Sequence, residues 1–261
     1  MKKLILLLLL INFSVHAQQK HPAPVHKKAI IVLTYDDALM SQLNIAIPQL
    51  DATHLNGTFF LTGNITQETL PGWRNAFKQG NELANHTLYH PCLITDGKGN
   101  PANNSANYTV YTIIREIGMM NNLLHVIDNE KTHTYAYPCT ESKVGGINYI
   151  DSLRKSAIVK YARMGGDQNA IVTDYNKLDP LLVPSWAVVG KITGDDLIAF
   201  VKKVQKEGGM GIFMFHGIGG DYLTTPAQAH SELLNYLNQH RNEIWVATFK
   251  QAMDYVTSVK R

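Results

Sequence analysis

The sequence predicts a single α/β domain folded as a closed or nearly closed barrel, and three observations support this. The chain has 261 residues, 45% of them hydrophobic, which is enough to bury one large core but not two comfortable domains. Short apolar runs alternate with longer amphipathic stretches along almost the whole chain. About seven such units follow one another without a linker or an internal repeat, which favours a barrel over an open sheet.

The apolar runs give the expected strands, and the amphipathic stretches give the expected helices. Strands are expected near residues 29–34, 57–61, 134–137, 157–162, 210–216 and 244–247. Helices are expected near residues 39–50, 66–79, 109–128, 146–155, 194–207, 225–240 and 248–258. The helix at 194–207 has the clearest limits, because the Thr193 hydroxyl can cap its start and Gly208 can end it. Strands separated by helices of this length predict a mostly parallel sheet.

The N-terminus has the pattern of a secretory signal peptide. Two lysines precede an apolar run over 4–13, and cleavage is expected after Ala17. A short polar leader (18–28) would then precede one domain at 29–261. The apolar run is too short for a stable membrane anchor, and no cysteine follows the cleavage point to carry a lipid. These features predict an exported protein, periplasmic or extracellular, without a membrane anchor.

The charge pattern argues against a nucleic-acid partner. The chain has 24 Lys and Arg residues against 21 Asp and Glu residues, a formal net charge of +3. Basic residues gather only in short pairs such as Lys27-Lys28 and Lys202-Lys203. Removal of residues 1–17 takes two lysines with it and leaves 22 minus 21, or +1. We therefore expect no nucleic-acid partner.

Export changes the interpretation of the 2 cysteines, because an oxidising compartment permits a disulfide. Cys92 follows His90-Pro91, and Cys139 follows Tyr137-Pro138. A bridge between them would join two segments that carry candidate functional residues. We predict this disulfide, and two unrelated buried thiols are the alternative.

The first candidate cluster lies where an apolar strand ends. The run Ile30-Ile31-Val32-Leu33 leads into Thr34-Tyr35-Asp36-Asp37, so two adjacent carboxylates emerge at the C-terminal end of a buried strand. Barrel enzymes keep their sites on this face. Acidic pairs at strand ends are also common turn formers, so a turn without chemistry is the alternative.

The second cluster is a pair of histidines four residues apart, His86 and His90. This spacing brings two imidazoles onto one face of a helical turn, where they could hold one metal ion. With 11 histidines in the chain, such a pair also arises by chance. A carboxylate from Asp36-Asp37 would complete a set of two histidines and one carboxylate with room for water, which suits a hydrolytic metal. Zn²⁺ is the default ion, and Co²⁺ or Ni²⁺ would fit equally.

The third cluster is His216, which ends the apolar run 210–215. A histidine exposed at a strand end can act as a general acid, since its unperturbed pKa lies near neutrality. A capped, hydrogen-bonded histidine without a catalytic role is the alternative. The glycines after it, at 217, 219 and 220, lack the lysine, hydroxyl and spacing of a P-loop.

Taken in order, these segments resemble the polysaccharide deacetylases of carbohydrate esterase family four, also described as the nodulation-type deacetylase homology domain. The resemblance covers nearly the whole chain after the leader. The matching segments are Thr34-Tyr35-Asp36-Asp37, Gly57-Thr58-Phe59-Phe60, residues 82–90, Tyr135-Ala136-Tyr137-Pro138, Met214-Phe215-His216 and residues 243–249.

The resemblance implies a distorted (β/α) barrel of about seven strands in a single domain. It also implies a divalent ion held by Asp37, His86 and His90, with Asp36 as the general base. Such a site removes acetyl groups from acetylated carbohydrate by metal-dependent hydrolysis.

The remaining catalytic roles follow from the same resemblance. The backbone N–H of Cys139, by its position after Pro138, would donate to the oxyanion. His216 would then protonate the leaving amine or alcohol.

Several positions depart from the pattern of the family. Ala136 stands where an arginine often orients the base, and Arg163 is expected to supply that charge from the next strand. The segment that usually offers an acid to the catalytic histidine is at best Ser185-Trp186. Asp221 is the nearest acid in sequence that could replace it.

Aromatic residues beside these segments are candidates for stacking on sugar rings. We take Trp186, Tyr137 and Tyr89 as the candidate substrate-binding residues, with Tyr108 and Tyr222 also flanking the segments. Packing in the core is the alternative for each of them.

Three functions are consistent with these residues. The first is a secreted deacetylase acting on N- or O-acetylated polysaccharide or oligosaccharide. The second is an acetyl xylan esterase restricted to O-acetyl groups, because the missing acid beside His216 suits an easier leaving group. The third is a catalytically impaired carbohydrate-binding protein on the same scaffold.

Overall fold

The central element of the fold is β1 (Ala29–Asp36), a strand in which every residue is buried. The computed structural model describes residues 27–260. β10 (Gly209–Phe215) pairs in parallel with one edge of β1. The other edge of β1 is shared by two strands. β11 (Ile244–Ala247) pairs with the first half of β1, and β2 (Thr58–Leu61) pairs with the second half.

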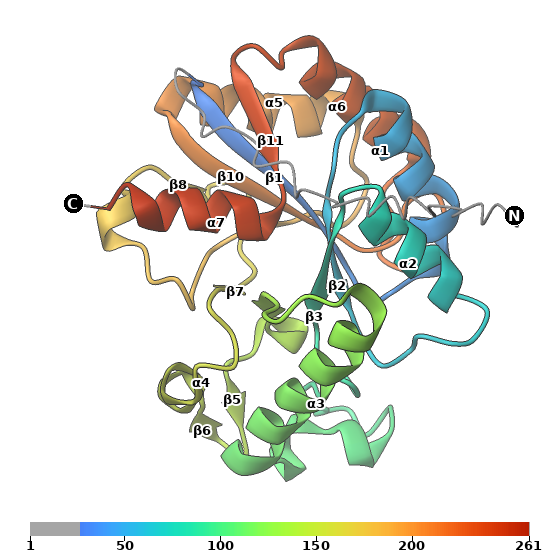
Figure 1. Ribbon diagram of the computed structural model, residues 1–261, viewed down its shortest axis with the longest axis vertical. Helices are drawn as coiled ribbons and strands as arrows, with labels where there is room; N and C mark the ends of the chain where they lie inside the picture. Colours follow the sequence, from blue (N-terminus) through green and yellow to red (C-terminus); the bar gives the residue numbers. More distant parts are fainter. Residues whose placement is uncertain (1–26, 261) are drawn as a thin grey trace, which may run out of the picture.

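The sheet continues from β2 in parallel and curls round toward β10 (Figure 1). β3 (Glu82–Asn85), β4 (Tyr135–Ala136) and β7 (Ala162–Arg163) follow β2 in this order. Arg163 then bridges to Val183, and β9 (Trp186–Ala187) pairs in parallel with β10.

Seven parallel strands of the described residues therefore run round a ring, namely β1, β2, β3, β4, β7, β9 and β10. Short β8 (Ile171–Val172) adds to β10 in antiparallel fashion, and β5 (Lys143–Val144) and β6 (Ile147–Asn148) form a separate hairpin. The expected fold class, a distorted α/β barrel of about seven strands, is confirmed.

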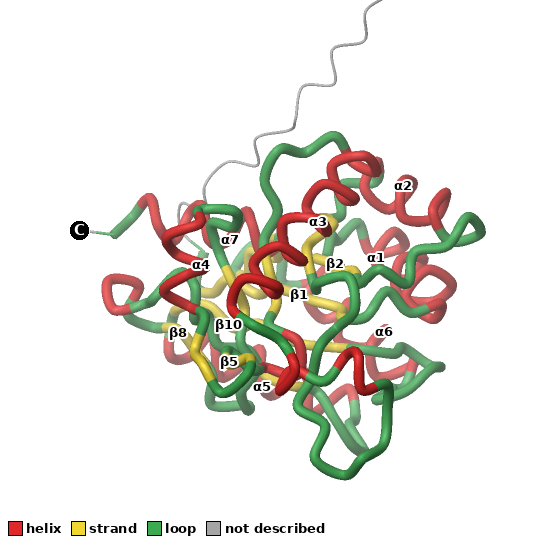
Figure 2. The backbone as a smooth tube through the Cα atoms, turned by 90° about the horizontal axis from the view of Figure 1, so that it is seen from below, coloured by secondary structure: helices red, strands yellow, loops and turns green. Residues whose placement is uncertain are grey.

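Helices surround the strands, as Figure 2 shows. In chain order they are α1 (Ile47–Thr53), α2 (Leu70–Lys78), α3 (Val110–Asp128), α4 (Ile150–Ser156), α5 (Gly194–Glu207), α6 (Ala227–Gln239) and α7 (Phe249–Ser258). α5 begins where expected, because Thr193 and Asp196 form a reciprocal capping box at its start, and Gly208 follows its end.

Alternation along β1 separates two parts of the core. The odd-numbered side chains, from Ala29 to Tyr35, join the large cluster that packs under α1, α5 and α6. The even-numbered Ile30 and Val32 join a second cluster with residues of α7, inside the ring of strands. Asp36 follows Ile30 and Val32 in this alternation, so its carboxylate lies at the C-terminal end of the barrel.

One expected strand was misplaced, and two strands of the ring, β3 and β9, were not predicted. The strand expected at 157–162 shrinks to β7, because Ala157 has a left-handed backbone and ends α4. β3 was not predicted, since Glu-Leu-Ala-Asn has little β-propensity. It is held as a strand by parallel pairing with β2 on one side and β4 on the other.

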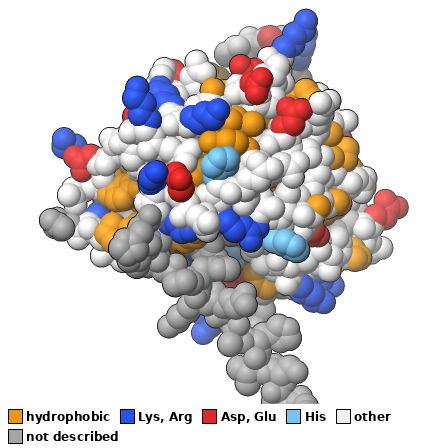
Figure 3. All heavy atoms as spheres, turned by 90° about the horizontal axis from the view of Figure 1, so that it is seen from above, with side chains coloured by type: hydrophobic (Ala, Val, Ile, Leu, Met, Phe, Trp, Pro, Cys, Tyr) orange, Lys and Arg blue, Asp and Glu red, His pale blue; other side chains and the backbone are white. Residues whose placement is uncertain are grey.

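The described part of the chain contains no helix with the length and hydrophobicity needed to cross a membrane. The expected signal peptide (1–17) and the leader as far as residue 26 lie outside the described residues. On the face seen in Figure 3, basic and acidic side chains are scattered among uncharged ones, and neither sign gathers into one large patch.

Candidate metal centre and catalytic site

The candidate residues meet at the C-terminal end of the barrel. Asp36 is the last residue of β1 and Asp37 follows it with a left-handed backbone (φ 81°). His86 directly follows β3, His216 directly follows β10, and Arg163 ends β7. Parallel strands end on the same face of a barrel, so residues far apart in the sequence converge there.

Three of these side chains could hold one metal ion. His86 Nε2 lies 3.5 Å and His90 Nε2 lies 3.3 Å from Asp37 Oδ1, and the two Nε2 atoms lie 3.1 Å apart. Bonds of about 2.1 Å to a tetrahedral Zn²⁺ place ligand atoms about 3.4 Å from one another. The spacing of the three donor atoms therefore fits a small divalent cation.

Neighbouring groups orient these donor atoms. His86 Nδ1 lies 2.9 Å from the carbonyl oxygen of Ala136, so Nδ1 carries the proton and leaves Nε2 free for a metal. The Tyr222 hydroxyl donates to Asp37 Oδ2 at 2.8 Å, which leaves Oδ1 facing the histidines. Burial, followed by the charge of His86, lowers the pKa of His90 to about 4, so its imidazole is neutral at neutral pH.

The two histidines do not share a helical turn, which corrects the expectation from their spacing. Residues 86–90 form an irregular loop after β3. Thr87 (φ 66°) and His90 (φ 51°) both have left-handed backbones, and these conformations turn the chain so that the imidazoles meet.

Arg163 pairs with Asp36 as the expected substitute for the missing arginine. Its Nη2 donates to Asp36 Oδ2 at 2.5 Å, and both side chains are buried. The guanidinium also lies over the ring of Phe60 and donates to Ser185 Oγ at 3.2 Å. Burial alone would raise the pKa of Asp36, but the charges of Arg163, His86 and His216 lower it below its ordinary value. Asp36 is therefore ionised at neutral pH, and its Oδ1 has no partner within the described residues.

His216 lies beside the same cluster, but its Nδ1 has no acidic partner within the described residues. Its Nε2 lies 3.8 Å from Asp37 Oδ2, and its Nδ1 is buried with no partner in the described chain. Asp221 does not serve as that partner, because its carboxylate accepts the N–H of Ser41 at 2.7 Å.

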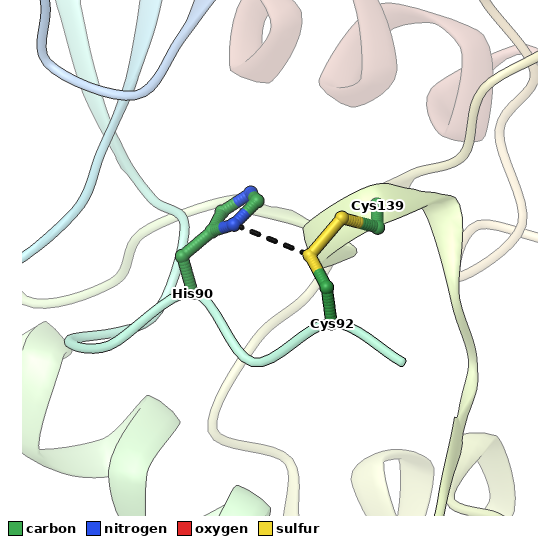
Figure 4. A group of neighbouring side chains, drawn as sticks. All are labelled: His90, Cys92 and Cys139. Atoms are coloured by element: carbon green, nitrogen blue, oxygen red, sulfur yellow. Dashed lines mark hydrogen bonds between the residues drawn. A yellow bond between two sulfur atoms is a disulfide. The ribbon is translucent and has the colours of Figure 1, made fainter. Parts of the chain in front are cut away.

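Cys92 and Cys139 form a disulfide beside the loop that carries His90 (Figure 4). Cys92 Sγ lies 3.4 Å from His90 Nδ1. Cys139 has a left-handed backbone (φ 51°) directly after Pro138. Because both sulfur atoms are bonded to each other, they offer no thiolate to a metal, and the bridge instead ties the His90 loop to the segment expected to carry the oxyanion donor.

The three aromatic candidates occupy different environments. Tyr89 is 61% exposed and directly precedes His90, one of the candidate metal ligands. Trp186 is buried against Phe200 and Phe213, so it packs in the core instead of lining a groove. Tyr137 is also buried, with its hydroxyl donating to the carbonyl oxygen of Leu181.

Tyr222 was named only as a flanking aromatic residue, and its contact with Asp37 was not predicted. It is 54% exposed and comes from the loop after β10. Its position two residues beyond Gly220 in an irregular loop gave no sign of where its hydroxyl would lie.

The barrel and this cluster define the class of protein. The sequence matches the family described as polysaccharide deacetylase over residues 23–153, half of the chain. The chain belongs to the polysaccharide deacetylase family. No curated protein sequence matches it significantly.

Solved structures with the same fold differ in what they do. The peptidoglycan deacetylase PdaC from Bacillus subtilis is 19% identical, with a TM-score of 0.53, over 90% of this chain and 93% of that one. A family 4 acetyl xylan esterase from Clostridium thermocellum, in complex with a cobalt ion, is 16% identical, with a TM-score of 0.55, over 89% and 96%. A CE4 family pseudoenzyme from Bacillus anthracis is 15% identical, with a TM-score of 0.52, over 88% and 66%. At these identities the likeness establishes the fold alone.

Proposed function

We propose that this protein is a secreted, metal-dependent hydrolase that removes acetyl groups from acetylated polysaccharide or oligosaccharide. The observation that carries the proposal is the convergence of Asp37, His86 and His90 beside the buried Asp36–Arg163 pair. Three neutral or anionic donors and an ionised base, all at the C-terminal end of a barrel, are the parts that acyl hydrolysis needs.

Asp37, His86 and His90 would hold the ion, most simply Zn²⁺, with Co²⁺ or Ni²⁺ as alternatives. When bound, such an ion supplies Lewis-acid chemistry that polarises the acetyl carbonyl and makes water more acidic. The tautomer of His86 and the hydrogen bond from Tyr222 to Asp37 prepare the donor atoms for this role.

Asp36 would act as the general base. Arg163 keeps its carboxylate ionised and fixes Oδ2, so the unpaired Oδ1 remains to accept the proton of the attacking water. The new oxygen–carbon bond turns the carbonyl oxygen into an oxyanion, to which the backbone N–H of Cys139 would donate.

His216 would act as the general acid. When the tetrahedral intermediate collapses, the bond to the sugar nitrogen or oxygen breaks, and that atom needs a proton as acetate departs. His216 Nε2 faces the cluster near Asp37, which supports this assignment.

Restriction to O-acetyl groups, as in an acetyl xylan esterase, is the second candidate. The buried Nδ1 of His216 has no carboxylate within the described residues to strengthen the imidazolium. An alkoxide leaves more easily than an amide nitrogen and tolerates a weaker acid, so this feature favours ester substrates. Carbohydrate binding without turnover is the third candidate. It is considered because Ala136 and Ser185 differ from the residues that the family pattern has at these positions.

Export is part of the proposal. The signal-peptide pattern of residues 1–17 and the Cys92–Cys139 disulfide both suit an oxidising periplasmic or extracellular location.

The test is acetate release by the purified chain from an N-acetylglucosamine oligomer and from acetylated xylan, with and without a chelator. Release that a chelator abolishes and added Zn²⁺ restores is the expected result. Release from xylan alone would select the esterase. Release that a chelator does not affect would contradict the metal site. No release from either substrate or from an aryl acetate, with metal bound, would favour the binding function.

A further inference from the structure

In the loop that joins the two histidines, each backbone N–H of residues 87–90 donates a hydrogen bond to a side-chain oxygen. The N–H of Thr87 donates to Asn85 Oδ1 at 2.8 Å, and the N–H of His90 donates to Thr87 Oγ1 at 2.9 Å. These two acceptors belong to the loop and the strand before it. The two middle N–H groups, of Leu88 and Tyr89, both donate to Oε1 of Glu116, at 3.1 and 2.9 Å.

Glu116 comes from α3, 26 to 30 positions away from the loop residues 86–90. Its side chain is buried on the apolar face of α3 that carries Ile113, Ile117 and Met120. A carboxylate is rarely buried on such a face unless it has specific partners. The two loop N–H groups are among those partners, and the Tyr108 hydroxyl is another.

The opposite side of the loop is held by backbone alone. The N–H of Gly63 donates to the carbonyl oxygen of Leu88 at 2.9 Å, and a Cβ at Gly63 would lie only 2.6 Å from that oxygen. The loop is therefore clamped between the segment after β2 and helix α3. The clamp maintains left-handed backbones at Thr87 and His90, which non-glycine residues keep only when their surroundings fix them.

The two histidines depend on this clamp to different degrees. His86 is buried and anchored through its ring to Ala136. His90 is partly exposed, and its ring is flanked by the disulfide sulfur of Cys92 at 3.4 Å. The orientation of His90 thus rests mainly on the backbone that Glu116 holds.

We propose that Glu116 is a positioning residue that presets the loop 86–90 so that His90 meets His86 and Asp37 before any ion binds. This inference rests on the proposed metal site. Its test compares Glu116→Ala, Glu116→Asp and Glu116→Gln. Aspartate keeps the charge but is one methylene too short, whereas glutamine keeps an acceptor oxygen in place.

Two measurements decide the role: Co²⁺ affinity by titration, and amide hydrogen exchange of residues 87–90 in the metal-free protein. We expect Glu116→Ala and Glu116→Asp to weaken Co²⁺ binding by about 10–100-fold, the usual loss for an outer partner of a metal ligand. Both should speed exchange at Leu88 and Tyr89. Glu116→Gln should stay close to wild type in both measurements.

Glu82→Ala is the matched control, because Glu82 also accepts a backbone N–H, that of Lys250, but at the opposite end of β3. It should lower stability and leave Co²⁺ affinity unchanged. Unchanged affinity and exchange in Glu116→Asp would overturn the proposal, even if Glu116→Ala did not fold. Weak binding by Glu116→Gln with normal binding by Glu116→Asp would overturn it too, since charge alone would then matter. If the wild type bound no Co²⁺, the proposed function would fail, while exchange would still decide whether Glu116 holds the loop.

Discussion

Two buried polar clusters begin at neighbouring residues of β1 and differ in how completely their atoms are paired. Tyr35 faces the helices, where its hydroxyl lies 2.7 Å from His230 Nε2 and His230 Nδ1 lies 2.6 Å from Gln49 Oε1. Asp36 faces the interior of the barrel, where its partner is Arg163. We call these the closed cluster (Tyr35, His230, Gln49) and the open cluster (Asp36, Asp37, His86, His90, Arg163, His216).

The open cluster contains three of the six buried side-chain polar atoms that have no partner within the described residues: Asp36 Oδ1, Arg163 Nε and His216 Nδ1. Both ring nitrogens of His230 in the closed cluster have partners. Buried polar atoms are normally paired, so unpaired ones gathered in one place need another explanation. A water or substrate group that completes them is the simplest one. The comparison teaches that completeness of pairing separates polar groups that stabilise the barrel from those available for chemistry.

The largest expected effect is the loss of catalysis in Asp36→Asn. Asparagine keeps an oxygen for Arg163 but cannot take a proton, so hydrolysis of an aryl acetate should fall by about 10²–10⁴-fold. Stoichiometric Zn²⁺ binding, measured on protein shown to be folded by circular dichroism, should persist. Asp254→Asn is the control, because this carboxylate pairs with Lys160 and Tyr161 away from the site. Equal rates for Asp36→Asn and wild type would remove Asp36 from the role of base.

The second prediction concerns the covalent support of the open cluster. The bridge between Cys92 and Cys139 spans a sequence separation of 47 residues. The double variant Cys92→Ser/Cys139→Ser should lose about 2–4 kcal/mol of unfolding free energy, because the unfolded chain gains freedom. Urea unfolding measures this loss. Reductant should lower the stability of the wild type and leave the double variant unchanged, and no difference between the two proteins would contradict the prediction.

The smallest expected effect lies in the closed cluster and depends on pH. Burial lowers the pKa of His230 to about 3, whereas an unfolded histidine titrates near 6.5. Below about pH 6.5 only the unfolded state takes up this proton, so the stability that neutral His230 contributes is lost progressively as the pH falls toward 3. The slope is about 1.4 kcal/mol per pH unit, or about 2 kcal/mol between pH 6.5 and 5.

His230→Gln should remove this part of the pH dependence, with catalysis at neutral pH unaffected. Urea unfolding of both proteins at pH 7.5 and pH 5 measures it. Identical pH dependence in the two proteins would mean that His230 does not stay neutral in the fold. A large loss of activity would break the distinction between the two clusters.

Residues at the ends of apolar strands could be placed from sequence alone. Asp36, Asp37 and His216 each end a run of buried aliphatic or aromatic residues, which is a local signal. Arg163 was placed through the resemblance to the family, because Ala136 stands where an arginine often orients the base and Arg163 was expected to supply that charge from the next strand.

Features set by distant contacts could not be placed in this way. The four-residue spacing of His86 and His90 fits a helical turn as well as a loop, and the acceptor that selects the loop, Glu116, lies on α3. The signal in the sequence was a carboxylate, Glu116, between the apolar residues Ile113 and Ile117 of that helix. Trp186 was misplaced for a similar reason, because its partners Phe200 and Phe213 come from later elements.

The pairing of β1 has a consequence for the order in which this protein acquires its structure. One edge of β1 is completed by residues 209–215, and half of the other edge by residues 244–247. During synthesis, β1 therefore lacks most of its pairing partners until almost the whole chain has been made. Until then only Thr34, Tyr35 and Asp36 have a partner strand, which is β2. Contacts this distant in sequence make folding slow. We expect the sheet around β1 to form only after β10 and β11 have been synthesised. A chain truncated before β10 should therefore not fold.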